Sequence, residues 1–171
     1  MAYFDLVAVP KEMAGEAAKR LGFRRIFCLG SDVELLEDMA QQPGRMKRIV
    51  AGSSAEALSR GIRRSDAVAA LATERSLNGK ELELLREMGK PLLIPLAQVT
   101  CAGEVERGRA LRRAKGAVRE AMMHKAPLAI ASMAGSVDCM MSAQQMLGIA
   151  KLLGMSDRVA ERALGALGEA L

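Results

Sequence analysis

Aromatic residues are scarce in this chain of 171 residues, which has no tryptophan, one tyrosine and three phenylalanines. Half of the residues are hydrophobic all the same, so the core must consist of Leu, Ala, Val, Ile and Met, with the twelve methionines as adaptable filler. A methionine-rich groove for a partner is the less favoured interpretation. Because aromatic rings for stacking single-stranded bases are nearly absent, any RNA would be recognised through its shape and backbone.

Histidine and cysteine are also rare. The single histidine, His124, lies at the end of a basic segment, and the three cysteines, Cys28, Cys101 and Cys139, are far apart. Without a second histidine or a close cysteine pair, the usual zinc knuckles and redox motifs are not indicated. We expect three buried thiols in a reducing cytoplasm.

Long apolar runs and nucleotide-binding motifs are missing too. No run approaches the ~20 apolar residues of a membrane span, and the first residues lack the basic start and small-residue cleavage site of a signal peptide. These absences favour a cytoplasmic protein that is not associated with a membrane. Neither G-x-x-x-x-G-K-[ST] nor G-x-G-x-x-G occurs after the first predicted strand.

Acidic residues near strand ends, which could serve acid–base chemistry or Mg²⁺ binding, are scattered. Asp5 lies in the first predicted strand, Glu74 follows the fourth and Asp138 follows the sixth, without a partner histidine or lysine in a motif. An independent active site and a bound cofactor are therefore not indicated. Two turns, at Gly30–Ser31 and Gly52–Ser54, could bind phosphate at a helix N-terminus, but plain N-capping is the simpler explanation.

What is present is a regular alternation of short apolar runs and amphipathic segments. The apolar runs predict strands at 4–9, 25–29, 48–51, 67–72, 92–96 and 128–131. Ser31 and Glu34 form a capping-box pattern, which predicts a helix from Ser31 through Met39. Further helices are expected at 11–21, from Ser53 to about Arg60, and from Asn78 or Ser76 to Met88. The last three are expected after Gly103 to about Lys125, after Ser142 and after Ser156.

This alternation predicts an α/β fold, and the continuously apolar strands suit a parallel sheet covered on both faces. The pattern leaves two architectures open, an open doubly wound sheet and a TIM-barrel-like, reduced or distorted (β/α) barrel with about six or more strands. The length falls short of the roughly 250 residues of a complete eight-unit barrel. No linker interrupts the pattern, so residues 1–171 are expected to form a single domain.

The formal net charge is +5, and the pI is near 9.4. This balance is compatible with nucleic-acid binding but does not establish it. The densest basic stretch is the long helix expected before Lys125, whose arginines Arg109, Arg112, Arg113 and Arg119 point away from an apolar side of Leu111, Ala114, Val118, Ala121 and Met122. Such a face is either an ordinary outer surface or a contact with phosphates.

Arg107 differs, because its spacing places it on the apolar side in the first turns of that helix. That end of a helix adjoins the carboxyl edge of a parallel sheet, where binding sites form. Arg75 and Lys80, which follow the fourth strand, are expected at the same edge. We therefore rank Arg107 above the other basic residues as a site residue.

The stretch from Pro127 to Met155 carries a resemblance. Its strand, Pro-Leu-Ala-Ile-Ala-Ser-Met-Ala, and its helix, Ser-Ala-Gln-Gln-Met-Leu-Gly-Ile-Ala-Lys-Leu-Leu-Gly-Met, resemble the C-terminal signature of the archaeal ribonuclease P protein component 3 family, the p30 subunit family. The resemblance covers about residues 65–170 and includes Ser132, Ala134, Ser142, Leu153, Gly154, Met155, Ala160, Ala163 and Leu164. The chain departs from the family at Met141, Gln144 and Gln145, where the family has charged residues, and it resembles a short, divergent member.

The resemblance implies a barrel-like subunit of the ribonuclease P ribonucleoprotein, which removes the 5′ leader from precursor tRNA. It implies that the RNA subunit carries catalysis with Mg²⁺, and that the partners are this RNA, a Pop5-type protein subunit and, through the complex, precursor tRNA. Residues expected to contact RNA are Arg75, Lys80, Arg107, Arg109, Arg112, Arg113, Arg119, Ser132 and Gln144. Two alternatives stay open: a small barrel enzyme that binds a phosphorylated metabolite, and a protein-interaction module that has lost RNA contact.

Overall fold

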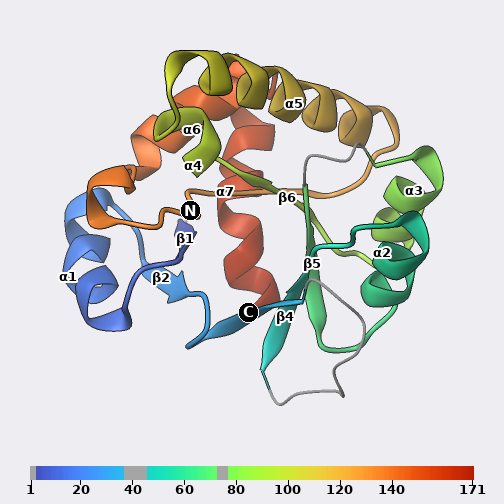
Figure 1. Ribbon diagram of the computed structural model, residues 1–171, viewed down its shortest axis with the longest axis horizontal. Coiled ribbons are helices and arrows are strands. Elements are labelled where there is room, and N and C mark those ends of the chain that lie inside the picture. The colour runs from blue at the N-terminus through green and yellow to red at the C-terminus, as the bar shows by residue number, and fades with distance from the viewer. Residues whose placement is uncertain (1–2, 37–45, 73–76) are drawn as a thin grey trace.

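The computed structural model describes residues 3–36, 46–72 and 77–171. Its strands are β1 (Phe4–Val7), β2 (Arg25–Cys28), β3 (Val33–Leu36), β4 (Lys47–Val50), β5 (Ala67–Leu71), β6 (Leu92–Pro95) and β7 (Leu128–Ala131). Its helices are α1 (Lys11–Leu21), α2 (Ala55–Ile62), α3 (Gly79–Glu87), α4 (Ala97–Thr100), α5 (Glu104–Met123), the 3₁₀ turn η1 (Val137–Cys139), α6 (Ala143–Leu152) and α7 (Asp157–Ala170) (Figure 1). The expectations for Met39, Glu74, Arg75 and Ser76 lie outside the described residues.

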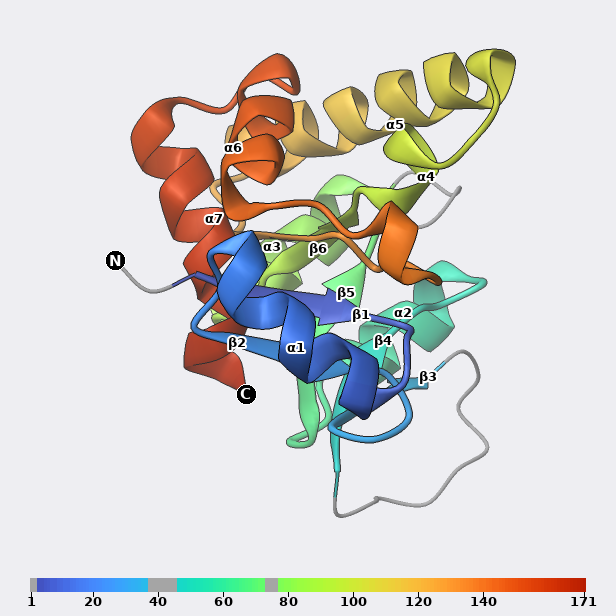
Figure 2. The same cartoon turned by 90° about the vertical axis from the view of Figure 1, so that its left-hand side faces the viewer.

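The strands form two parallel sheets. One has the order β3-β4-β5-β6-β7, and the other pairs β1 with β2. All six predicted strands are present within a few residues of their expected positions, so the α/β class and the parallel arrangement are confirmed. Figure 2 shows α1 on the outer side of β1 and β2, and α5 lying across the molecule beside α4.

The helix predicted to begin at Ser31 is wrong, because Val33–Leu36 forms a strand instead. The chain turns at Gly30, whose φ is +82°, and the Ser31 N–H donates to the Cys28 carbonyl oxygen rather than opening a helix. Glu34 lies opposite Arg48 in β4 and accepts a hydrogen bond from its guanidinium at 2.9 Å. Pairing with β4 and burial of Val33 override the local capping pattern, since strand formation depends strongly on tertiary context.

Other helix ends follow the sequence signals more closely. Gly22 ends α1 with φ +81°, Gly154 follows α6 with φ +101°, and Ser142 forms a capping box with Gln145. The cap of α2 is Ser54, one residue later than expected, and its hydroxyl accepts from the Ala57 N–H at 3.2 Å. The expected linker at 97–103 contains the short helix α4.

The two sheets contact each other along both of their edges. At the β1–β7 seam, residues 5–8 and 132–134, the Met133 N–H donates to Leu6 O at 2.8 Å and the Ala8 N–H donates to Ala134 O at 2.9 Å. At the β2–β3 seam, residues 28–33, Leu29 forms a parallel bridge with Val33. Each sheet therefore continues into the other through backbone contacts at both of its edges.

The core has an outer and an inner part. The outer part lies between strands and helices, whereas the inner part contains residues from all seven described strands together with Leu167 of α7, which is fully buried. The strand residues of the inner part are Leu6, Phe27, Val33, Ile49, Val68, Ala69, Leu93, Ala129 and Ala131. Figure 1 shows α7 among the strands in the middle of the view. Gly168 of α7 is packed so closely on the Phe4 ring that a Cβ atom would collide with it.

Candidate functional site

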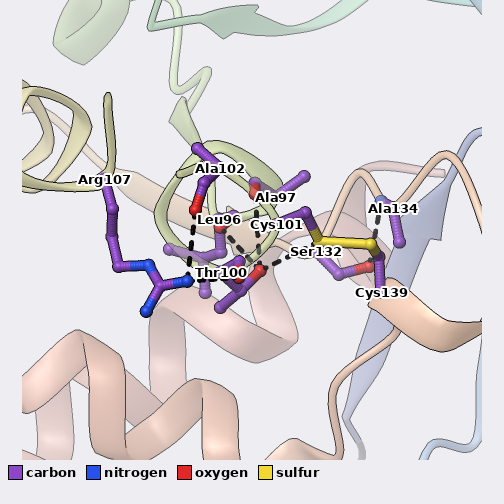
Figure 3. The surroundings of a disulfide bond; sticks show 9 residues. All are labelled: Leu96, Ala97, Thr100, Cys101, Ala102, Arg107, Ser132, Ala134 and Cys139. Atoms are coloured by element: carbon purple, nitrogen blue, oxygen red, sulfur yellow. Dashed lines mark hydrogen bonds between the residues drawn. A yellow bond between two sulfur atoms is a disulfide. The ribbon is translucent and has the colours of Figure 1, made fainter. Parts of the chain in front are cut away.

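The segments that follow the carboxyl ends of β6 and β7 lie side by side. The Leu96 N–H donates to Ala131 O at 2.9 Å, and the Ala97 N–H donates to Ser132 O at 2.7 Å, so α4 begins directly beside the segment that follows β7. At the far end of α4, a disulfide joins Cys101 to Cys139 of η1 (Figure 3).

The disulfide corrects the expectation of three buried thiols, because Cys28 is the one free cysteine. Cys101 and Cys139 are 38 residues apart in the chain, yet their Cα atoms are 6.0 Å apart because β6 and β7 are neighbours that end at the same edge. Spacing along the chain gives no sign of this pairing. Burial raises the pKa of the Cys28 thiol.

Arg107 lies in the first turns of α5, and in Figure 3 its side chain lies on the other side of α4 from the disulfide. Its guanidinium Nη2 donates to the carbonyl oxygens of Ala102 at 3.1 Å and Thr100 at 3.5 Å, the two residues that flank Cys101. The side chain is exposed, so its expected place on the buried side of the helix is wrong, while its hydrogen bonds place it beside α4, the helix that follows β6.

The arginine face of α5, defined as Arg109, Arg112, Arg113 and Arg119, is exposed as predicted, whereas Ala110, Val118 and Ala121 are buried on the opposite side. Arg109 pairs with Glu106 at 3.2 Å, a surface ion pair of little strength. Arg113 lines a small cleft of about 30 Å³ together with Ala72, Pro95 and Gln98. This cleft lies between the arginine face and the carboxyl ends of β5 and β6.

Lys80 and Arg107 are separated by the structure. Lys80 is exposed in the first turn of α3, and the neighbouring Gly79 lies against the His124 ring at the C-terminal end of α5. Because α5 rises about 1.5 Å per residue, that end is roughly 25 Å along the helix from Arg107. The structure therefore does not bring Lys80 and Arg107 together, and their common role at one edge of the sheet stays a prediction. Arg75 lies outside the described residues.

Ser132 is fully buried in the β1–β7 seam. Its hydroxyl donates to Asp5 Oδ2 at 2.6 Å and its N–H donates to Asp5 Oδ1 at 2.7 Å; the Leu6 N–H completes the set at 2.8 Å. Burial raises the pKa of Asp5 to about 6, although the hydrogen bonds from Ser132 and Leu6 oppose the rise. Ser132 thus binds strand ends together, and its hydroxyl is not presented to a ligand.

Gln144 is exposed on α6, in a hollow of about 320 Å³ that also contains Lys151, Asp157 and Glu161. Lys151 is paired with Asp157 at 2.8 Å. The carboxylates of this hollow weaken its attraction for phosphate, so Gln144 contributes less than the arginine face to a positive surface.

A larger groove of about 990 Å³ lies on another part of the molecule. Phe4, Met122, Val159 and Ala166 form part of its apolar lining, and Met122 is 43% exposed there rather than buried as predicted. Its cationic lining residues are Arg24, Lys125 and Arg162, and its acidic ones are Glu161 and Glu169. The sequence pattern predicted no such groove, because its walls come from three parts of the chain that lie far apart in sequence.

Within the described residues, no group of three or more His, Cys, Asp or Glu side chains could hold a metal ion. No helix of that same part is long and apolar enough to cross a membrane. At the Gly52–Ser54 turn, Ser54 caps α2 with its own hydroxyl, which agrees with the simpler of the two explanations for this turn.

The sequence matches no known family model, and no curated protein matches it significantly. Among solved structures, the chain is similar to a chain in the cryo-EM structure of archaeal ribonuclease P with mature tRNA. The two chains are 11% identical with a TM-score of 0.65, and the similarity covers 98% of this chain and 89% of the other. Despite the low identity, this chain therefore has the fold of that chain over nearly its whole length.

Proposed function

We propose that this chain is a protein subunit of a ribonuclease P ribonucleoprotein and a divergent member of the p30 subunit family. The observation that carries the proposal is the shared fold, which covers 98% of this chain. The resemblance of residues 65–170 to that family supports the same assignment from the amino-acid sequence. In this role the protein folds and positions a catalytic RNA that removes the 5′ leader from precursor tRNA in the cytoplasm.

We further infer that the seven strands form one distorted barrel. Two features support this: the two sheets meet at both seams, and every described strand contributes to one inner core. In such a barrel the carboxyl ends of β6 and β7 form one rim, on which α4, η1 and the start of α5 lie.

The RNA-binding surface in this proposal is Arg107 together with the arginine face. These side chains are exposed along one helix, and phosphate contacts of this kind supply affinity without reading base sequence. Chemistry remains with the RNA and its Mg²⁺, and a Pop5-type subunit is the proposed protein partner.

Reconstitution tests the proposal directly. An archaeal ribonuclease P RNA and the other protein subunits are assembled with and without this chain, and cleavage of precursor tRNA is measured over a range of Mg²⁺ concentrations. We expect the chain to lower the Mg²⁺ requirement and raise the cleavage rate. An unchanged rate and Mg²⁺ dependence would remove the basis for this function.

Variants of the basic surface test the site. Arg107→Ala combined with Arg112→Ala and Arg113→Ala should weaken binding to the ribonuclease P RNA and lower the slope of log K against log salt by about 3, roughly 1 per lost phosphate contact. Arg158→Ala, an exposed arginine on α7, is the matched control and should leave the slope unchanged. Equal slopes for the triple variant and the control would assign RNA binding elsewhere.

A protein-binding module is a second candidate, favoured by the groove of about 990 Å³ and the exposed Met122 on its wall. The two candidates differ in what Met122→Glu disrupts. It should leave RNA binding by the isolated chain intact and abolish assembly with a protein partner if the groove is the main functional surface.

A further inference from the structure

The Cys101–Cys139 disulfide joins a firmly anchored segment to a loosely anchored one. The Cys139 side is firmly held: Ser132 is bonded to the buried Asp5, and Ala134 O accepts from the Ala8 N–H at 2.9 Å. After Cys139 the chain passes at once into the buried Met140 and Met141. The chain on both sides of Cys139 is therefore held by contacts that do not involve the disulfide.

The Cys101 side is anchored at the start of α4, where the Ala97 N–H donates to Ser132 O at 2.7 Å, four residues before Cys101. The turn from Cys101 to Gly103 connects α4 to α5, Cys101 and Gly103 are exposed, and Gly103 caps α5 without a side-chain hydrogen bond. Its backbone contacts are the Cys101 N–H to Ala97 O at 2.8 Å and the Arg107 N–H to Gly103 O at 2.8 Å. The disulfide is the covalent link between this turn and the anchored segment.

Arg107 depends on the position of this turn. Its guanidinium donates to the carbonyl oxygens of Thr100 and Ala102, on either side of Cys101, and Figure 3 shows it pointing toward these two residues. A change in the backbone at Cys101 moves both acceptors. The side chain ranked first as a phosphate contact is therefore held by the carbonyl groups of the two residues that flank Cys101.

We propose that the Cys101–Cys139 disulfide is a reversible redox strap that sets the position of Arg107 and thereby tunes the affinity of the basic surface for RNA. The inference rests on the proposed function and adds its regulation. The oxidised form holds the turn and presents Arg107 next to the arginine face. The reduced form frees the turn and weakens that one phosphate contact.

The reaction is thiol–disulfide exchange with a dithiol reductant. A thiolate of the reductant attacks the sulfur of Cys101, the more exposed of the pair, and the Cys139 sulfur leaves as a thiolate that takes up a proton. The second thiolate of the reductant then displaces the Cys101 thiolate, which is also protonated, and closes the reductant's own disulfide. Two electrons and two protons pass to the protein, and a disulfide oxidant reverses the reaction.

The test compares oxidised protein with protein reduced by dithiothreitol, each titrated with a ribonuclease P RNA transcript at several salt concentrations. Reduction should weaken binding about threefold to tenfold and lower the salt slope by about 1, as the loss of one phosphate contact requires. Cys101→Ser should reproduce the reduced state under oxidising conditions. Cys28→Ala, which leaves the strap intact, should keep the full redox response.

Arg107→Ala provides the decisive comparison, because the proposal requires that this variant bind RNA equally in both redox states. Equal affinity of the oxidised and reduced wild-type protein, or a redox response that persists in Arg107→Ala, overturns the strap. In either case RNA binding itself, and with it the proposed function, stands. Absence of salt-dependent RNA binding in both redox states overturns the proposed function as well.

Hydrogen exchange covers the case in which Cys101→Ser fails to fold. On reduction of the wild-type protein, amide exchange should accelerate at residues 101–107 and stay unchanged at residues 132–134. Acceleration at both segments, or at neither, contradicts the difference in anchoring on which the strap depends.

Discussion

The β1–β7 seam and the β2–β3 seam join the same two sheets by different chemistry. At the first, Asp5 and Ser132 are both fully buried, and one carboxylate accepts three hydrogen bonds. At the second, Asp32 accepts from the Cys28 N–H at 3.0 Å and from Lys11 at 2.6 Å, and the Lys11 side chain is 60% exposed. One seam relies on buried hydrogen bonds, and the other on Asp32, whose side chain is 10% exposed and is paired with an exposed lysine.

This difference has energetic consequences. A buried donor that loses its acceptor costs its full desolvation penalty, because no water replaces the partner. An exposed ion pair exchanges protein contacts for water at little cost. The β1–β7 seam should therefore be the more sensitive to substitution, although each seam has only a few bonds.

Asp5→Ala should have the largest effect. It leaves two backbone N–H groups without an acceptor and the Ser132 hydroxyl with only a 3.5 Å contact to Leu6 O, and we expect the free energy of unfolding to fall by about 3 to 5 kcal/mol at pH 7. Urea unfolding of the wild-type protein and of Asp5→Ala measures this loss. Asp5→Asn is the control, since an amide oxygen still accepts from both N–H groups and the loss should be smaller. A loss below about 1 kcal/mol for Asp5→Ala would show that the seam does not depend on this carboxylate.

The pH dependence of stability should have opposite signs at the two seams. The folded pKa of Asp5, about 6, lies above its unfolded value, so the folded state holds the proton longer and this group's contribution to stability falls as pH rises from about 4 to 6. Two pKa units correspond to about 3 kcal/mol. The difference in unfolding free energy between wild type and Asp5→Asn, measured across this window, should shrink or reverse with rising pH.

Asp32 behaves in the opposite way. Desolvation acts to raise its pKa, but hydrogen bonds from Lys11 and the Cys28 N–H outweigh it and leave the pKa lowered. Its stabilising contribution is therefore present above its unfolded pKa and is lost as pH falls through the lowered folded value. A difference between wild type and Asp32→Asn that grows as the pH is lowered would contradict this assignment.

Gly168→Ala tests the packing of α7 over the first seam. The new methyl group would collide with the Phe4 ring of β1, and we expect a loss of about 1 to 3 kcal/mol, measured by thermal unfolding. Gly148→Ala on α6 is the matched control, because no atom lies within 4 Å of its added Cβ. The control should be neutral or stabilising by up to about 1 kcal/mol. Equal losses for the two substitutions would show that Gly168 is not tightly packed against the Phe4 ring.

The smallest effects are expected at the β2–β3 seam. Asp32→Ala removes the acceptor of the Cys28 N–H and should cost about 1 to 2 kcal/mol, whereas Lys11→Ala removes only an exposed partner and should cost about 0.5 kcal/mol. Urea unfolding of these two variants and of Asp5→Ala ranks the two seams by the unfolding free energy that each substitution removes. The comparison fails if Asp32→Ala is as damaging as Asp5→Ala.

The sequence predicted the strands and most helices because their signals are local. Gly22 and Gly154 end helices through positive φ angles, and Ser142 caps α6 through a residue three positions later. The exposed arginine face also follows from helical spacing alone. The prediction failed at Val33–Leu36, where a capping pattern was present but pairing with β4 decided the outcome. A local pattern cannot register a partner that lies elsewhere in the chain.

By itself, therefore, the sequence determined the α/β class, the order of the elements and the basic helix, since hydrophobic periodicity and capping act over a few residues. Only the tertiary structure brought Asp5 to Ser132, Cys101 to Cys139 and the start of α3 to the end of α5. These contacts join residues far apart in the chain, and they form because parallel strands place their ends at common edges. The residues that close the seams and orient Arg107 could thus be found only once the sheets were assembled.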